Sequence, residues 1–529
     1  MGAAILHLWH ILDSHKTVLD QSIVIDTHIG QSSQPIQRCK QESVSNATND
    51  QFVDDTETIQ ASLEELDSSE DATELVDIGK KLPHTSVVAH APGWTIFRDL
   101  YMSNGTLYIL SSNRSFPEIR MMTSTPLPAF NTPENIAARE PNAQQMDFVT
   151  PEEAQARWGG KSQLGEINRV LSIEGNTFFI NDPDQFLGHY YHFVGELFFG
   201  AWTFWAGAWS TPANDPQSAF DLSPPPPPHI DRVIFPHADA QGWRDDTGFN
   251  AYFLRAVFPS LNVEIKDDWE DRIIVTTTKD RAWHFPVVLI ADRSASFRGS
   301  ICGSETQRTA SEAFEIMRSQ HQLLGHHVGG WWQPVRKAMW DFASAVPSPV
   351  RRVNLDTEPS NLLLPMPEKI VITYISRQGG PRRKLREADH VDLVAALEAL
   401  VARKGAGWEL LVIQAEQIPK DEQIQVAART TILLGVHGNG LTHLVFTRPT
   451  RASAVVELFY PGGFAHDYHW TARALGMDHY AVWNDTYMTH PDEPEVNYPE
   501  GFQGNEIPVN GATVARLIEE HVDKRAAEA

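Results

Sequence analysis

The sequence predicts an α/β fold built from two core-forming domains. Strand and helix patterns alternate along two separate stretches of the chain, which is typical of the βαβ units of a parallel sheet. A proline-rich segment at residues 346–367 separates the two stretches, and the length of 529 residues exceeds one ordinary hydrophobic core. We therefore expect domains at residues 81–345 and 368–529, joined by a linker at 346–367.

Residues 1–80 are expected to form a flexible acidic segment. From about residue 31 to residue 80 the chain is rich in Ser, Thr, Gln, Asp and Glu and has few large apolar side chains. Such a stretch buries too little surface to offset the entropy lost on ordering, and it suits a stem or tether. Met1–Leu12 is apolar but short and has no basic residues before it, so it predicts neither a signal peptide nor a membrane span.

The first stretch reads as strands followed by alternating helices and strands. Its expected strands are Thr106–Leu110, Thr177–Ile180, Asp231–Pro236 and Arg272–Val275. Its expected helices are Gly188–Trp202 and Gly248–Phe258. The polyproline run near 223–228 cannot continue a helix or an inner strand, so it predicts a surface insertion.

The second stretch repeats the alternation more regularly. Its expected strands are Lys369–Ser376, Glu409–Gln414, Thr430–Val436 and Ala454–Phe459. Its expected helices are Asp389–Arg403, Lys420–Arg429 and Tyr468–Gly476, the last ended by a glycine.

A glycine-rich turn, His437–Gly440, follows the third of these strands. In that position the backbone N–H groups that open the next helix can hold a phosphate, which points to a nucleotide-type ligand. Glycine after a strand also serves the turn alone, so both interpretations stay open at this point.

Three sequence blocks, in order along the chain, carry a family resemblance. They are His189–Leu197 (HYYHFVGEL), Ile372–Leu385 with its Ser-Arg pair and following arginines, and Gly435–Leu458 with GVHGNGLTH and VVEL. They resemble the aromatic and histidine-bearing motif, the Ser-Arg strand and the GxHGAGLTN to VxEL block of glycosyltransferase family 61. Here Asn439 replaces the usual Ala and His443 the usual Asn.

The resemblance implies a GT-B architecture, in which two Rossmann-like domains face a cleft. It also implies an inverting glycosyltransferase that moves a sugar, xylose or N-acetylglucosamine, from a UDP-sugar to a glycan or glycoprotein acceptor. No metal cofactor is expected, and family members typically act in the lumen of the Golgi or endoplasmic reticulum, often membrane-anchored. The sequence leaves the donor sugar, the acceptor and the oligomeric state open.

Positive groups near the glycine-rich turn are the expected donor site. A nucleotide sugar presents a diphosphate whose negative charge grows as the glycosidic bond breaks, so cations or N–H donors must face it. The expected donor-binding residues are Arg377, Arg382, Arg383, His437, Gly438, Asn439, Gly440, Thr442 and Glu457. Glu457 would bind the ribose or uracil of the donor, or else cap the next helix. If the arginine segment does not bind the donor, it is a solvated loop. The formal net charge of −25 excludes general nucleic-acid binding.

The acceptor hydroxyl needs a base, and Glu196 and His192 are the candidates because helical spacing places them on one face. His189 shares that face, but taken alone we interpret it as a buried core histidine. In another function class, a metal-dependent hydrolase, His189, His192 and Glu196 would bind zinc. An inactive nucleotide-sugar-binding module is a third possibility, favoured if Asn439 and His443 spoil the site. Asp182-Pro183-Asp184 is the one attractive D-x-D, and we interpret it as a turn instead of a metal site.

Cysteines and sequons add little. Cys39 and Cys302 are the only cysteines, and the sequence does not say whether they pair. The sequons at Asn46, Asn104, Asn113 and Asn484 are compatible with passage through the secretory pathway.

Overall fold

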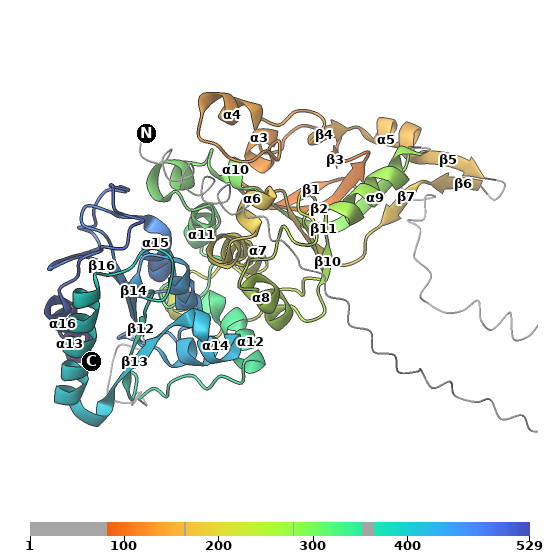
Figure 1. Cartoon of the computed structure of the whole chain (residues 1–529). Coiled ribbons are helices and arrows are strands. Elements are labelled where there is room, and N and C mark those ends of the chain that lie inside the picture. The colour runs from red at the N-terminus through yellow and green to blue at the C-terminus, as the bar shows by residue number, and fades with distance from the viewer. Residues whose placement is uncertain (1–81, 163–164, 279, 352–363, 529) are drawn as a thin grey trace, which may run out of the picture. The chain divides into compact units, whose positions relative to one another are not determined.

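The computed structural model describes residues 82–162, 165–278, 280–351 and 364–528, and side chains within 160–168 are outside the description. The acidic segment 1–80, with Cys39 and Asn46, lies outside the described residues, as does most of the linker 346–367. The expected α/β class is confirmed, because the described chain forms two large sheets with helices packed on them (Figure 1).

The first sheet has nine strands and is mixed, although the sequence predicted a parallel one. Its main path runs in the order β10-β9-β8-β11-β2-β3-β4, with β1 paired to β2 and β7 to β11. Its strands are β1 (Ser86–Ala91), β2 (Trp94–Ser103), β3 (Thr106–Leu110), β4 (Met146–Val149), β7 (Val170–Ser172), β8 (Asn176–Ile180), β9 (Arg232–Ile234), β10 (Asn262–Glu264) and β11 (Ala282–Ala291). The pairs along β10-β9-β8-β11 are parallel, whereas β2 is antiparallel to β1, β3 and β11. Short turns between β1, β2 and β3 impose that change of direction.

The helices of this half include the two that the sequence predicts, at Gly188–Trp202 and Gly248–Phe258. The elements are α3 (Ile119–Met122), α4 (Pro133–Ala138), α5 (Pro151–Trp158), α6 (Asp184–Leu187), the π-helix η2 (Tyr191–Phe198), α7 (Phe199–Ala208), η3 (Pro216–Phe220), α8 (Phe249–Val257), α9 (Lys266–Thr277), α10 (Arg293–Ser296), η4 (Ile301–Thr306), α11 (Ala310–Ser319), η5 (Gly330–Trp332) and α12 (Gln333–Phe342), with a small β5 (Gly159–Ser162) and β6 (Gly165–Asn168) hairpin. The helix expected at Gly188–Trp202 is present as η2 and α7, and its first eight residues are wound as a π-helix.

The prediction of a strand at Arg272–Val275 is wrong, because these residues lie in α9. The carboxylate of Asp268 accepts a hydrogen bond from the backbone N–H of Ile265 and caps the start of the helix. Ile274 is 62% exposed, so its β-branched side chain does not mark an inner strand. The local apolar run suggested a strand, but the acidic first turn, with Asp267 and Asp268 five and four residues before Arg272, favours the helix.

The second sheet confirms the predicted strand and helix alternation. Its order is β13-β12-β14-β15-β16-β17, and every pair is parallel except the last. Its strands are β12 (Ile370–Ile375), β13 (Trp408–Ile413), β14 (Ile432–Val436), β15 (Ala454–Leu458), β16 (Asp478–Trp483) and β17 (Thr486–Thr489). The helices are α13 (Glu387–Lys404), η6 (Gly405–Gly407), η7 (Ala415–Gln417), α14 (Lys420–Arg429), the 3₁₀-helix η8 (Asn439–Phe446), α15 (His466–Ala474) and α16 (Gly511–Ala527). Helices α13 and α16 lie together on one side of this sheet, and α12 and α14 lie on the other (Figure 1).

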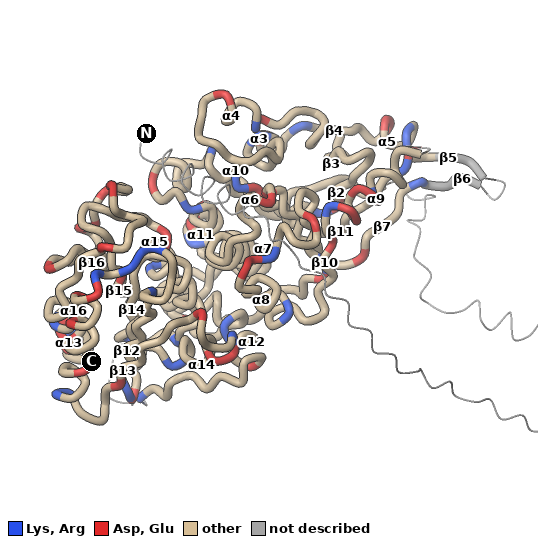
Figure 2. Tube along the Cα trace, viewed as in Figure 1, with Lys and Arg blue, Asp and Glu red and all other residues tan. Residues whose placement is uncertain are grey.

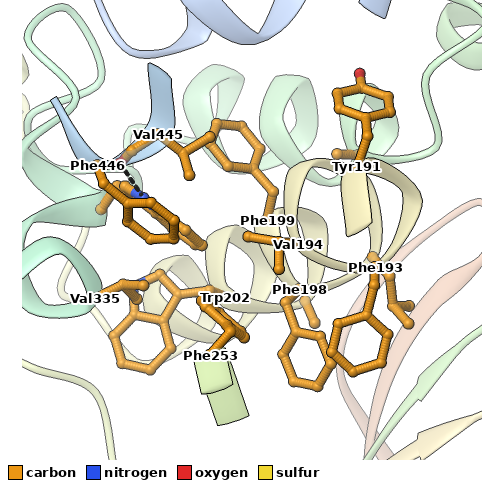
Figure 3. Packing of buried hydrophobic residues seen from close by; sticks show 14 of the residues in the cluster. Tyr191, Phe193, Val194, Phe198, Phe199, Trp202, Phe253, Val335, Val445 and Phe446 are labelled. Atoms are coloured by element: carbon orange, nitrogen blue, oxygen red, sulfur yellow. Dashed lines mark hydrogen bonds between the residues drawn. The ribbon is translucent and has the colours of Figure 1, made fainter. Parts of the chain in front are cut away.

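One aromatic-rich core joins residues from both sheets' helices. Figure 3 shows side chains of η2 and α7, among them Phe199 and Trp202, packed close to Phe253 of α8 and to Val445 and Phe446 of η8. The indole N–H of Trp332 donates to the Val445 carbonyl at 2.9 Å, and that of Trp340 donates to the Phe446 carbonyl at 2.8 Å. This packing fixes η2, which carries the candidate base, against the turn that opens η8.

Charged residues of both signs are spread over the described chain (Figure 2). Within the described residues, none of the helices combines the length and the hydropathy that a membrane crossing requires.

Candidate functional site

The glycine-rich turn has the predicted strand, turn and helix arrangement. Strand β14 ends at Val436, His437 and Gly438 form the turn, and η8 begins at Asn439. Gly438 is needed for a close approach, because a Cβ there would lie 2.8 Å from Arg377 Nη1 and 3.2 Å from Arg383 Nη1. The turn therefore brings two guanidinium groups against bare backbone.

The three predicted arginines lie near one another. Burial, together with the charges of Arg377 and Arg382, lowers the pKa of Arg383 to about 10. Burial also lowers the pKa of Arg377, and the charge of Arg382 adds to that effect. The Nε atom of Arg377 is buried without a hydrogen-bond partner, and no carboxylate among the described residues forms an ion pair with Arg377 or Arg383. Such a cluster of like charges favours binding of an anion.

Arg383 is held in place by its backbone and by neighbouring groups. Its φ of 58° is in the left-handed region that residues other than glycine rarely adopt. Its Nε donates to Gln503 Oε1 at 2.6 Å, and its Nη1 donates to the His437 carbonyl at 3.2 Å.

Behind the turn lies a fully buried carboxyl group, that of Glu457. Hydrogen bonds join its two oxygens to His437 Nδ1 at 2.5 Å and to His479 Nε2 at 2.7 Å. Burial raises the pKa of Glu457 well above its usual range and lowers that of His479 to about 3. Both oxygens of Glu457 are therefore engaged inside the protein, and Glu457 orients the His437 ring.

The two departures from the family pattern have internal partners. Asn439 Oδ1 accepts hydrogen bonds from the Tyr191 N–H at 3.1 Å and from the Thr442 hydroxyl at 3.4 Å. The buried ring of His443 is hydrogen-bonded to the Tyr190 hydroxyl at 3.1 Å and to Gln423 Oε1 at 2.8 Å. Neither His443 nitrogen is left to face a ligand. The methyl position of an alanine at Gly440 would lie 3.0 Å from an Ile375 carbon, so Gly440 allows η8 to pack on β12.

The two candidate bases have different environments. Glu196 is 1% exposed and pairs with Arg293 at 2.8 Å and with Arg308 at 3.3 Å. Burial by itself would raise the pKa of Glu196, but these two guanidinium groups outweigh it and hold the pKa well below the usual range. His192 is partly exposed, and its Nδ1 is hydrogen-bonded to Glu196 Oε2 at 2.5 Å. The arrangement is a histidine oriented by a carboxylate, which suits proton transfer by His192.

His189 does not lie in the core as expected, because it is exposed in the turn before η2. Its ring centroid is 4.8 Å from that of His192. The chain turns between α6 and η2 at this point, so the helical periodicity that would have buried His189 begins only after it.

Asp467, at the start of α15, lies between the two groups of residues. Its carboxylate accepts a hydrogen bond from Arg308 Nη1 at 2.6 Å. Burial would raise the pKa of Asp467, but Arg308, His437 and His192 together lower it. The Tyr191 hydroxyl donates to the Asp467 carbonyl at 2.9 Å. The Asp467 carboxylate therefore interacts electrostatically with both the His192 side and the His437 side of the site.

The acidic pair Asp182 and Asp184 lies where the chain passes from β8 into α6. Asp182 accepts hydrogen bonds from the Arg293 N–H at 2.8 Å and from Arg293 Nε at 3.2 Å, and burial raises its pKa to about 6. Asp184 is exposed at the start of α6. The same Arg293, with Arg308, also puts positive charge beside Glu196, which disfavours a divalent cation there.

Residues 190–456 match the family described as Glycosyltransferase 61. The chain belongs to glycosyltransferase family 61. A stretch of 137 residues is 34% identical to the EGF domain-specific O-linked N-acetylglucosamine transferase of Drosophila melanogaster. That match covers 26% of this chain and 24% of the relative, so it spans about a quarter of each protein.

The family match includes most of the predicted site and ends just before Glu457. The structure gathers Arg377, Arg382, Arg383 and the His437–Gly440 turn in one place, and their roles stay predictions. Sequence reasoning missed Arg293, Arg308, Asp467 and His479. The sequence indicates these four residues only by their type, because they lie in no motif that includes the residues they pair with.

Proposed function

We propose that this protein is an inverting glycosyltransferase that uses a UDP-sugar. The observation that supports the proposal is the convergence of Arg377 and Arg383 on the bare backbone of Gly438, with no carboxylate of the described chain paired to either. Two cations of this kind, at the turn before a helix, fit the diphosphate of a nucleotide sugar. The two sheets would then be the two Rossmann-like halves of a GT-B enzyme, and the site would lie where η2 meets the η8 turn.

In this mechanism the donor half stabilises the leaving group. The bond between the sugar's anomeric carbon and the diphosphate breaks, and the charge that develops on UDP is balanced by Arg377, Arg383 and the N–H groups that open η8. Binding needs no metal, because the guanidinium groups supply the positive charge. His437, oriented by Glu457, would contact the donor from the end of β14.

The acceptor half supplies the base. The acceptor oxygen attacks the anomeric carbon from the face opposite the diphosphate, and its proton passes to His192. Glu196 holds the His192 ring through Nδ1 and stays ionised between its two arginines. We therefore assign the base to His192 and a positioning role to Glu196.

N-acetylglucosamine is the sugar to test first, with xylose second. The Drosophila melanogaster relative is described as an O-linked N-acetylglucosamine transferase specific for EGF domains, which supports a glycoprotein acceptor in the secretory pathway lumen. The sequon residues Asn104, Asn113 and Asn484 are exposed and therefore accessible to glycosylation.

The test is donor binding and turnover with the purified protein. UDP, UDP-N-acetylglucosamine and UDP-xylose are titrated by calorimetry, and release of UDP is followed without and with EGF-domain acceptors. We expect binding of UDP and of one sugar nucleotide, with slow UDP release that an acceptor accelerates. Binding without any release of UDP would instead support the inactive module. Failure to bind UDP or either UDP-sugar would overturn the proposal.

A further inference from the structure

Outside the donor and acceptor residues, a second group of chemically active side chains gathers at α15. His469, on α15, faces His490 and Glu493, which follow β17. One ligand atom from each of the three residues lies within 4.8 Å of the other two.

Two atoms of this group are buried without partners. His469 Nε2 and Glu493 Oε2 have no hydrogen-bond partner, and the His469 side chain is only 4% exposed. A buried polar atom that is left unpaired destabilises the folded protein, so the arrangement calls for a ligand. The ion pairs of Glu493 with His469 and His490 involve its other oxygen, Oε1, and leave Oε2 without a partner. Arg473 Nη1 is 4.0 Å from Glu493 Oε1, at the limit of an ion pair.

Two of the distances between ligand atoms are close to those around one small cation. His469 Nε2 is 3.5 Å from Glu493 Oε1, and His490 Nδ1 is 3.1 Å from the same oxygen. A tetrahedral zinc ion with bonds of about 2.0–2.2 Å keeps its ligand atoms roughly 3.3–3.6 Å apart. Two imidazoles and one carboxylate are a ligand set that zinc prefers over magnesium or calcium.

His466 supplies an outer partner. Its Nδ1 lies 3.2 Å from Nδ1 of His469. A proton on His469 Nδ1 would be donated to His466, which leaves the lone pair on Nε2 to face the group. Metal-bound histidines are commonly held in this way through their second nitrogen.

We propose that His469, His490 and Glu493 form a zinc site, with water in the fourth position. The ion joins α15 to the segment after β17. Further along that segment, Gln503 accepts the hydrogen bond from Arg383, and the ring of Phe502 packs 5.2 Å from that of His437. The zinc ion therefore holds in place the segment that carries Phe502 and Gln503 beside the candidate donor site. Zinc binding does not depend on the proposed transfer reaction.

The test is zinc binding to the full chain. Protein stripped with a chelator and dialysed is titrated with Zn²⁺ against a competing chromophoric chelator, and bound metal is counted by mass spectrometry. We expect one tightly bound ion per chain and a rise in the thermal midpoint, because zinc binds the folded state. If the stripped chain takes up no zinc, the site does not exist.

Variants locate the ion. His490→Ala and Glu493→Gln avoid the buried His469, so folding is expected to survive. Each should weaken zinc affinity by more than roughly 100-fold, because even loss of an outer partner costs about 10–100-fold. His229→Ala is the matched control, since His229 is an exposed histidine that also pairs with a carboxylate, that of Asp231. Wild-type zinc affinity in either His490→Ala or Glu493→Gln would overturn the assignment.

Discussion

At the scale of single residues, the arginines of the site differ in whether a carboxylate of the protein pairs with them. Arg377 lacks a carboxylate partner in the described chain, whereas Arg293 and Arg308 both pair with Glu196. An arginine without an internal counter-ion is available to a ligand, and one inside a network holds other side chains in place. Substitution of Arg377 should therefore change UDP affinity, whereas substitution within the Glu196 network should also change the stability of the fold.

Arg377→Ala should weaken UDP binding. Loss of a charge-assisted hydrogen bond costs about 1.5–3 kcal/mol, which corresponds to roughly a 10- to 150-fold rise in Kd. Calorimetry with UDP measures it. Arg386→Ala is the control, because Arg386 belongs to the same basic segment but its side chain is 53% exposed. Equal UDP affinity in the Arg377 variant and the wild type would remove Arg377 from the donor site.

His192→Ala should lower kcat by about 10²–10⁴-fold and leave UDP affinity unchanged, because the base contacts the acceptor and not the diphosphate. His189→Ala, which changes the adjacent exposed ring, should have a much smaller effect. The measurement is the transfer rate at saturating donor, with UDP titrations of each variant. Near-normal turnover in folded His192→Ala protein would place the base elsewhere.

Glu196→Gln should reduce stability as well as activity. Removing one partner from a buried ion-pair network costs about 3–5 kcal/mol, because Arg293 and Arg308 keep their charges. Denaturant unfolding measures the loss. Glu315→Gln is the control, since Glu315 pairs with Arg318 on the surface at 2.6 Å and such pairs contribute about 0–1 kcal/mol. A similar loss of unfolding free energy in both variants would show that the buried ion pairs contribute no more to stability than a surface pair.

At the scale of elements, the turn between β14 and η8 decides how the arginines approach the backbone. A side chain at Gly438 would meet the guanidinium groups of both Arg377 and Arg383. The two elements that flank the turn are fixed independently, β14 by its neighbours β12 and β15 and η8 by the Trp332 hydrogen bond. A substitution in the turn should therefore disturb the site without unfolding the sheet.

Gly438→Ala should lower UDP affinity, because the added methyl group displaces the two guanidinium groups from the turn. Titration with UDP and a thermal melt of the same sample separate the loss of binding from any loss of folding. Gly407→Ala is a suitable control, since a Cβ at Gly407 meets nothing within 4 Å. A folded Gly438→Ala protein with wild-type affinity would mean that the turn does not border the donor.

At the scale of the whole molecule, buried aromatic and histidine side chains connect the two sheets. His443 on η8 contacts Tyr190, just before η2, and Gln423 on α14. Burial lowers its pKa to about 4. The neutral ring thus fits a core that both halves share, and protonating it would disrupt contacts with elements far apart in the sequence.

His443 should make the protein less stable in acid. The unfolded chain takes up a proton at this histidine near pH 6.5, but the folded chain does so only near pH 4. Stability contributed above pH 6.5 is therefore lost as the pH falls towards 4, by at most about 3 kcal/mol. His443→Asn should flatten this part of the curve of unfolding free energy against pH. An unchanged slope would show that His443 is not neutral in the folded protein.

Local features of the sequence were sufficient for part of the structure. The strands and helices from β12 to α15 follow from apolar periodicity, and the β14 turn follows from its glycines, because each pattern involves residues a few positions apart. The pairing of His192 with Glu196 follows from their four-residue spacing. Family membership and the α/β class were also predicted correctly.

Tertiary structure alone decided the rest. Arg293 and Arg308 lie about a hundred residues from Glu196, and only the topology of the first sheet brings them to its carboxylate. Their charges hold the pKa of Glu196 well below its usual range, and its carboxylate is hydrogen-bonded to His192. The antiparallel pairing of β2 with β11 and the zinc ligands on α15 and beyond β17 likewise depend on contacts between distant segments. A sequence pattern records what neighbouring residues favour, whereas the charge state and partner of a side chain depend on which distant groups the fold places beside it.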